Sequence, residues 1–156
     1  MTRGGFAEMH CSVARTLDVV GERWSLLILR DAFNGIHRFD AFQASLGIAR
    51  NILADRLAKL VEHGVLERRR YAEHPPRDEY RLTAKGRALF DVLMAMVHWG
   101  DTWESEGAEP PVTITHEGCG AVMHAVPACS NCGQILTPWN VRTHPARTEA
   151  DAGVSA

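Results

Sequence analysis

The chain has 156 residues, 46% of them hydrophobic, and a formal net charge of −2 at pH 7. A chain of this length can bury one domain core and carry a small appendage. It has no long apolar run and no signal-peptide pattern in its first ten residues, so we expect a soluble, cytoplasmic protein. In that reducing compartment the four cysteines are expected to be thiols or metal ligands rather than disulfides.

The charge is unevenly distributed along the chain. The overall negative charge argues against a nucleic-acid partner. Residues 23–87, however, carry 13 Lys and Arg against 8 Asp and Glu, and further acidic residues follow residue 100. We therefore expect a basic part that can face phosphate groups and an acidic part directed away from them.

Two short helices separated by a glycine turn are predicted in this basic part. The first spans Phe39 to Leu46, and Gly47 allows the tight turn that follows it. The second runs from about Arg50 to His63, and Gly64 ends it. Its apolar residues recur at helical spacing and are expected to face a core: Leu53, Leu57, Leu60 and Val61.

The opposite face of the second helix carries polar residues at its start. Arg50 and Asn51 are the side-chain types that pair with guanine and adenine in the major groove, each through two hydrogen bonds. We therefore expect these two residues to read bases. An Arg- and Asn-bearing face is by itself more typical of ordinary solvated surface.

A β-hairpin is predicted after the second helix. Residues 65–71 and 79–82 are strand-like, and the proline-rich segment between them is expected to interrupt the ladder because proline lacks an N–H donor. Arg77 lies in this predicted tip. The arginines at 68–70 are compatible with a charged edge strand, but the order of helix, turn, helix and hairpin favours DNA binding. The candidate DNA contacts are Arg38, Arg50, Asn51, Asp55, Arg56, Lys59, Arg69 and Arg77.

A long amphipathic helix is predicted from Ala84 to Glu106, with Thr83 as its N-cap. It presents two apolar stripes, of which one suffices to pack on the preceding domain. The other is expected to be covered by a second copy of the chain, or alternatively by the C-terminal segment. The first stripe comprises Leu89, Leu93, Met96, Val97 and Trp103, and the second comprises Phe90, Met94 and Trp99.

The C-terminal segment contains two metal-ligand pairs of similar form. His116 and Cys119 are separated by two residues and followed by glycine, as are Cys129 and Cys132. Two such knuckles complete a tetrahedral, structural zinc site. His124 is an alternative fourth ligand, and a redox dithiol of Cys129 and Cys132 is the alternative to zinc.

The sequence also resembles the HxlR family of bacterial winged helix regulators. The resemblance rests on residues 10–33 (HCSVARTLDVVGERWSLLILRDAF) and continues through RFDAF, IARNILADRL, LVEHGVL and PPRDEYRLTAKG. It implies a homodimeric, sequence-specific transcriptional regulator, with repression as the expected mode, that responds to an oxidant, electrophile or small metabolite. Several members carry a redox-sensing cysteine where this chain has Cys11, although an ordinary packed cysteine fits that position equally well.

The predicted fold is mainly α (α+β): a winged helix-turn-helix domain with a small zinc-ribbon-like β appendage. The domains are expected at residues 1–108 and 109–141, with a disordered tail at 142–156. No phosphate-binding loop, nucleophile elbow or paired carboxylates support an enzyme. The alternative function is a winged-helix protein-interaction module with a redox-active C-terminal dithiol.

Overall fold

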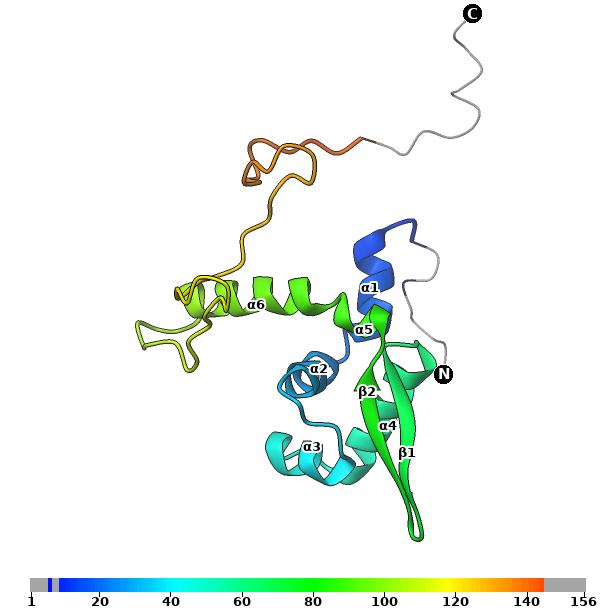
Figure 1. The fold of residues 1–156 in the computed structure, drawn as a ribbon. Coiled ribbons are helices and arrows are strands. Elements are labelled where there is room, and N and C mark those ends of the chain that lie inside the picture. The colour runs from blue at the N-terminus through cyan, green and yellow to red at the C-terminus, as the bar shows by residue number, and fades with distance from the viewer. Residues whose placement is uncertain (1–5, 7–8, 145–156) are drawn as a thin grey trace, which may run out of the picture. The chain divides into compact units, whose positions relative to one another are not determined.

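The computed structural model describes residue 6 and residues 9–144, and the chain divides into two compact units, residues 1–110 and 111–156. Figure 1 shows the first unit as a group of helices with one projecting hairpin. Its elements are α1 (Ser12–Val20), α2 (Ser25–Phe33), α3 (Phe39–Leu46), α4 (Arg50–Glu62), β1 (Leu66–Glu73), β2 (Pro76–Leu82), α5 (Ala84–Arg87) and α6 (Phe90–Trp103).

The core of the first unit forms where α2, α3 and α4 meet. Leu53, Leu57 and Leu60 of α4 are fully buried, which confirms the predicted core stripe, whereas Val61 packs against its edge. Burial of each such leucine stabilises the fold by about 1.5–3 kcal/mol. The other fully buried side chains come from α2, α3 and the start of the hairpin: Ile28, Leu29, Phe42, Val65 and Leu66.

Glycines end both helices of the predicted pair. Gly47 has φ 61°, and its N–H bonds to the carbonyl of Gln43 at 3.0 Å. A Cβ at Gly47 would meet nothing within 4 Å, so the backbone conformation and not crowding favours glycine here. Gly64 likewise has φ 67° just after α4. The predicted helix-turn-helix is therefore confirmed.

The hairpin is longer than the sequence predicted. The antiparallel ladder runs from the pair Leu66 and Leu82 to the pair Glu73 and Pro76, with an irregularity between Arg70 and Ala72. The expectation that prolines would interrupt this ladder was wrong. Pro76 opens β2, a position where a missing N–H is tolerated in a strand.

The predicted long helix is also divided. Thr83 caps α5 as expected, by accepting a hydrogen bond from the Gly86 N–H at 3.1 Å. Gly86 is buried, and a Cβ there would collide with the backbone carbonyl of Val65. The chain then turns at residues 88 and 89 before α6 begins, and α6 ends at Trp103. The close packing of Gly86 fixes α5, and the ring of Phe90 packs on Phe33 with centroids 5.7 Å apart, so the two helices are anchored separately.

The second unit has a different character. Its described residues, 111–144, form no helix or extended strand, only the isolated bridges Thr115 to Val122 and Ala128 to Ile135. The predicted zinc-ribbon strands are therefore absent from this part of the chain. The predicted tail lies mostly outside the described residues. Across the described parts of both units, no helix has the length and apolar character needed to span a bilayer.

The two bridges belong to two loops that share three backbone hydrogen bonds. In the first loop the N–H groups of His116, Gly120 and Met123 bond to the carbonyls of Ala121, His116 and Ile114. In the second loop the equivalent bonds run from Cys129, Gly133 and Leu136 to Gln134, Cys129 and Pro127. Every residue of the second set lies thirteen positions after its counterpart, so residues 114–123 and 127–136 are an internal repeat.

Candidate nucleic-acid interface

The first turn of α4 presents its two polar residues to solvent. Arg50 and Asn51 are both exposed, while Leu53, in the same turn, is buried. The Arg50 guanidinium lies over the ring of Phe39 at 4.8 Å from its centroid. This contact holds the Arg50 guanidinium at the junction of α3 and α4. Arg50 and Asn51 are both accessible to a ligand there.

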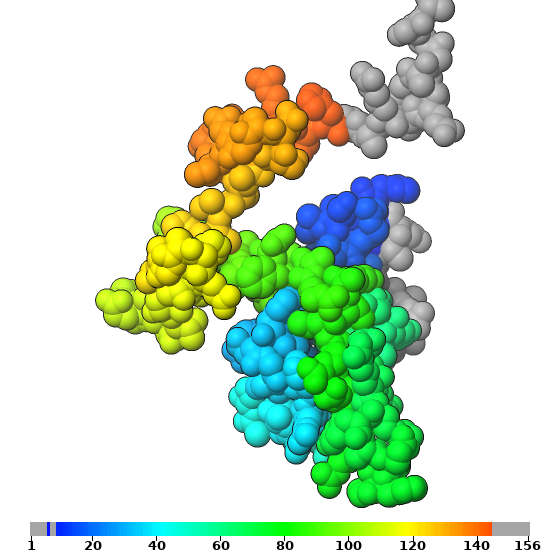
Figure 2. All heavy atoms as spheres, viewed as in Figure 1, coloured from blue at the N-terminus to red at the C-terminus, as the bar shows by residue number. Residues whose placement is uncertain are grey.

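Arg38 connects α3 with the hairpin. It is the N-cap residue of α3, and its guanidinium lies 4.7 Å from the centroid of the Tyr71 ring on β1. Its backbone forms a bridge with Glu79 of β2, and the Tyr80 N–H bonds to the His37 carbonyl at 2.7 Å. The hairpin is thereby fixed against the helix-turn-helix. Figures 1 and 2 show α3 and the hairpin at the same end of the unit.

The remaining charged residues of α4 form an ion-pair network. Arg56 lies 2.9 Å from Glu22 and 2.6 Å from Asp55, and only 16% of its side chain is exposed. Lys59 lies 3.5 Å from the same Glu22 and 3.3 Å from Asp55. The predicted DNA contacts Asp55, Arg56 and Lys59 therefore form ion pairs with one another and with Glu22, in the segment before α2. Arg56 is also too buried to contact DNA directly. Glu22, which lies far from α4 in sequence, was not among the predicted site residues.

The hairpin arginines are also largely paired. Arg68 and Arg70 both contact Asp78 on the facing strand, Arg69 contacts Glu67, and Arg81 lies 2.9 Å from Glu79. The hydrogen bond from Arg68 holds the pKa of Asp78 below its ordinary value. Arg81 does the same for the pKa of Glu79.

Arg77 differs from the other hairpin arginines. It is exposed on β2 opposite Ala72, next to the tip, and makes none of the ion pairs seen within the described hairpin. Together with Arg38, Arg50 and Asn51 it is available to an outside partner. Arg69 is also exposed, with 62% of its side chain accessible, and its partner Glu67 is half-exposed.

Cys11 lies at the N-cap of α1. The backbone amides of Ala14 and Val13 lower the pKa of its thiol, because they stabilise the thiolate at the open start of the helix. The thiolate form of Cys11 is thus favoured relative to that of an ordinary cysteine.

The predicted metal ligands lie in the two loops of the second unit. His116 Nδ1 is 3.4 Å from Cys119 Sγ. The amides of Cys132 and Asn131 lower the pKa of the Cys129 thiol. Among the described residues, no group of three or more His, Cys, Asp or Glu side chains gathers at one metal position. The structure thus brings His116 and Cys119 together but does not gather the four predicted ligands at one position.

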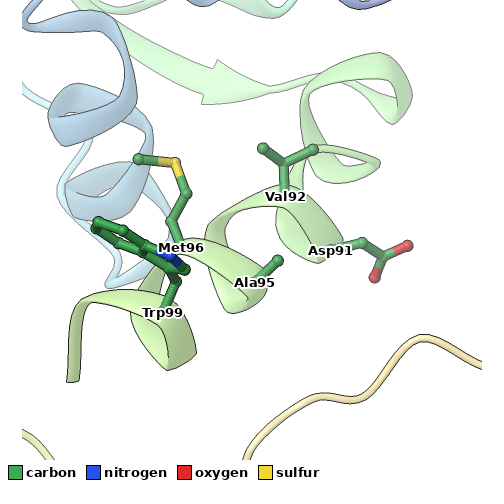
Figure 3. A pocket seen from close by; sticks show the side chains of 5 residues that line it. All are labelled: Asp91, Val92, Ala95, Met96 and Trp99. Carbon is green, nitrogen blue, oxygen red and sulfur yellow. The ribbon is translucent and has the colours of Figure 1, made fainter. Parts of the chain in front are cut away.

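An exposed apolar stripe runs along α6. Its residues are Val92, Met96, Trp99 and Trp103, with Trp103 71% exposed. Figure 3 shows Val92, Met96 and Trp99 lining one shallow groove with Asp91 and Ala95. The predicted stripes were therefore partly wrong, because Met96 and Trp103 face outward and Met94 is half-buried.

A helix-turn-helix followed by a hairpin wing defines a winged helix-turn-helix domain, a class that typically carries its recognition residues on the second helix of the motif. Residues 19–108 match the family model of HxlR-like helix-turn-helix proteins. The chain belongs to the HxlR-like helix-turn-helix family, whose members are transcriptional regulators and not enzymes.

Individual relatives agree with this assignment. The chain is 45% identical over 136 residues to an uncharacterised HTH-type transcriptional regulator of Mycobacterium tuberculosis, covering 86% of this chain and 85% of the relative. The solved structure of PA1607, a candidate transcription factor, is 42% identical with a TM-score of 0.80 and covers 90% of this chain and 99% of its own. The redox regulator HypR in its oxidised form is 33% identical with a TM-score of 0.55, covering 59% of this chain and 96% of its own.

Proposed function

We propose that the chain is a transcriptional repressor that binds a specific duplex DNA sequence as a homodimer. The observation that carries this proposal is the first turn of α4, where Arg50 and Asn51 are exposed directly beside a fully buried core stripe. A helix anchored by one face can enter the major groove with the other. Arg50 then pairs with guanine and Asn51 with adenine.

The remaining candidate residues have two different roles in this proposal. Arg38, Arg69 and Arg77 are exposed and contact the phosphate backbone, which orients the domain without reading sequence. Asp55, Arg56 and Lys59 instead hold α4 in position through Glu22. The wing carboxylates keep Arg68 and Arg81 paired, so the wing carries fewer available charges than its sequence suggests.

Homodimerisation is supported by the exposed apolar stripe of α6 and by the exposed Val13 and Leu17 of α1. Four large apolar side chains in a row on one helix form a surface that is costly to leave in water. A twofold dimer through α1 and α6 would present two copies of α4 to half-sites spaced about 34 Å apart, one turn of DNA.

A thiol-reactive signal is supported by Cys11. Its lowered pKa makes the thiolate, the form that reacts with oxidants and electrophiles, more abundant at neutral pH. Cys11 immediately precedes α1, one of the two helices of the proposed dimer interface, so its modification would alter the interface and hence the distance between the two DNA-reading helices.

Fluorescence anisotropy with labelled duplexes tests the proposal. We expect the full-length protein to prefer a fragment from the intergenic region beside its own gene over a scrambled duplex by at least about a thousandfold. Affinity for both should fall steeply between about 50 and 200 mM salt, because bound phosphates release counterions. Salt-independent binding without sequence preference would reject DNA recognition and favour a protein-interaction module.

A further inference from the structure

The second unit has no hydrophobic core of its own. None of its described residues, 111–144, is buried, although the segment includes several large apolar side chains. Val112, Val122, Ile135 and Trp139 are all more than half exposed. A segment this short without a core needs a disulfide, a metal ion or a partner to hold one conformation. Its cysteines are free thiols.

The internal repeat places metal donors at equivalent positions of the two loops. His116 and Cys129 begin the two turns, and Cys119 and Cys132 end them. Gly120 and Gly133 follow with φ 68° and 74°, a conformation that favours glycine and reverses the chain after each pair. The repeat therefore preserves the donors, their spacing and the backbone that presents them, while the residues between the donors differ.

The separation within the first pair fits a shared tetrahedral ion. Two ligands of a tetrahedral zinc, one nitrogen at about 2.0 Å and one sulfur at about 2.3 Å, lie about 3.5 Å apart. His116 Nδ1 and Cys119 Sγ are 3.4 Å apart. A Cβ at Gly118 would lie 2.8 Å from the His116 ring, so the small residue between the two donors gives the imidazole room to turn toward the sulfur.

We propose that His116, Cys119, Cys129 and Cys132 together bind one Zn²⁺ per chain, with each loop supplying half of a tetrahedral site. Binding replaces the three thiol protons, which pass to solvent, and uses the neutral imidazole as the fourth ligand. The four donors do not meet at one metal position among the described residues, so binding must draw the two loops together around the ion. The ion then takes the place of the hydrophobic core that the segment lacks. Four protein ligands leave no open position, so the role of the site is structural.

His124 does not belong to this ligand set. It lies outside both repeated loops, and its position thirteen residues on is occupied by Thr137, which is not a thiol or imidazole. A dithiol of Cys129 and Cys132 alone would explain one loop and leave the matching donors of the other unexplained. The presence of a donor pair in each loop therefore favours a metal site over a redox-active dithiol.

Zinc analysis of the full-length protein, purified without chelator and without added metal, tests this proposal. We expect about one zinc per chain by mass spectrometry. C119S and C132S, one from each loop, should each reduce zinc to under about a tenth of an equivalent, and so should H116Q. H124Q and C11S are matched controls that should retain it. A thermal melt of the helical signal verifies in each variant that the winged domain is folded.

Cobalt substitution of the wild type provides a second readout that needs no mutation. We expect intense visible absorption of the tetrahedral type together with a thiolate charge-transfer band. Retention of zinc in C119S, or its loss in H124Q but not in H116Q, would overturn the ligand set. A metal-free protein that takes up no cobalt would overturn the site altogether, and an intact mass two hydrogens lower would then identify a disulfide.

Discussion

The guanidinium of Arg56 on α4 lies 2.9 Å from the carboxylate of Glu22, in the segment that joins α1 to α2. The two residues are 34 positions apart in sequence, and their contact fixes the recognition helix to the preceding part of the domain. Arg56 also contacts Asp55, and its Nε is buried without a partner. The pair is thus a structural connection beneath the surface that faces DNA in our proposal.

Loss of this connection should lower stability rather than specificity. We expect R56A to reduce the free energy of unfolding by about 1–3 kcal/mol, because the substitution removes a half-buried ion pair and its packed aliphatic stem. The preference for operator over random duplex should remain within about threefold of wild type. Urea unfolding and anisotropy titrations measure the two quantities. A stable R56A protein that has lost discrimination would show instead that Arg56 reads bases.

The spacing of apolar residues predicted the core of this fold better than it predicted the charged surface. Leu53, Leu57 and Leu60 are buried because a helix has a fixed period, which the sequence displays directly. The pairing of Arg56 with Glu22 depends on how distant segments pack, and no local pattern encodes it. The pairing of Arg70 with Asp78 is easier to predict from the sequence, since it follows from the hairpin register once that register is known.

The stripes of α6 were misassigned for a related reason. All residues of the two predicted stripes lie at 89–103, within or directly before α6, so the turn at residues 88 and 89 leaves their spacing relative to one another unchanged. Leu93 is buried and Leu89 and Val97 are half-buried, whereas Met96 and Trp103 of the same predicted stripe are exposed, so the covered face of α6 is narrower than that stripe. Which apolar residues of α6 are covered depends on the neighbouring α2, whose Phe33 packs on Phe90, and helical periodicity does not express that contact.

Base reading should be separable from backbone contact. We expect R50A and N51A each to reduce discrimination between operator and scrambled duplex by about 1–3 kcal/mol per lost bidentate contact. R77A should weaken binding to both duplexes and lower the slope of log affinity against log salt by about one. Equal losses on both duplexes in all three variants would contradict the assignment of α4 to bases and the wing to phosphates.

The wing should lose its ion pairs in acid. The pKa of Asp78 is lowered in the folded state by Arg68, so this carboxylate stabilises the wing above the ordinary aspartate value of about 4. The contribution disappears as the pH falls through the lowered folded pKa. The Nε–H resonance of Arg68, followed by NMR, should therefore shift only below that ordinary value. D78N serves as the control and should show no such step, and a step at the ordinary aspartate pKa would argue against the pair.

Cys11 should react as a thiolate at lower pH than an ordinary cysteine. The hydrogen bonds from the Ala14 and Val13 amides that lower its pKa form only when α1 is folded. We therefore expect the pH midpoint of its iodoacetamide labelling, followed on its own peptide by mass spectrometry, to be lower in the folded protein than in urea. Identical midpoints in the two states would remove the electrostatic basis for a sensor at this position.

The exposed stripe of α6 should determine the oligomeric state. Val92, Met96, Trp99 and Trp103 are exposed on α6, and a charge placed among them is costly to bury in an interface. We expect W99E and M96E to shift the sedimentation mass from dimer to monomer and to weaken operator binding at least about tenfold, since a monomer engages a single half-site. T102E, an exposed residue of the same helix outside the stripe, should stay dimeric. A wild type that sediments as a monomer at micromolar concentration while binding its operator tightly would refute the dimer, because the stripe would then have another occupant.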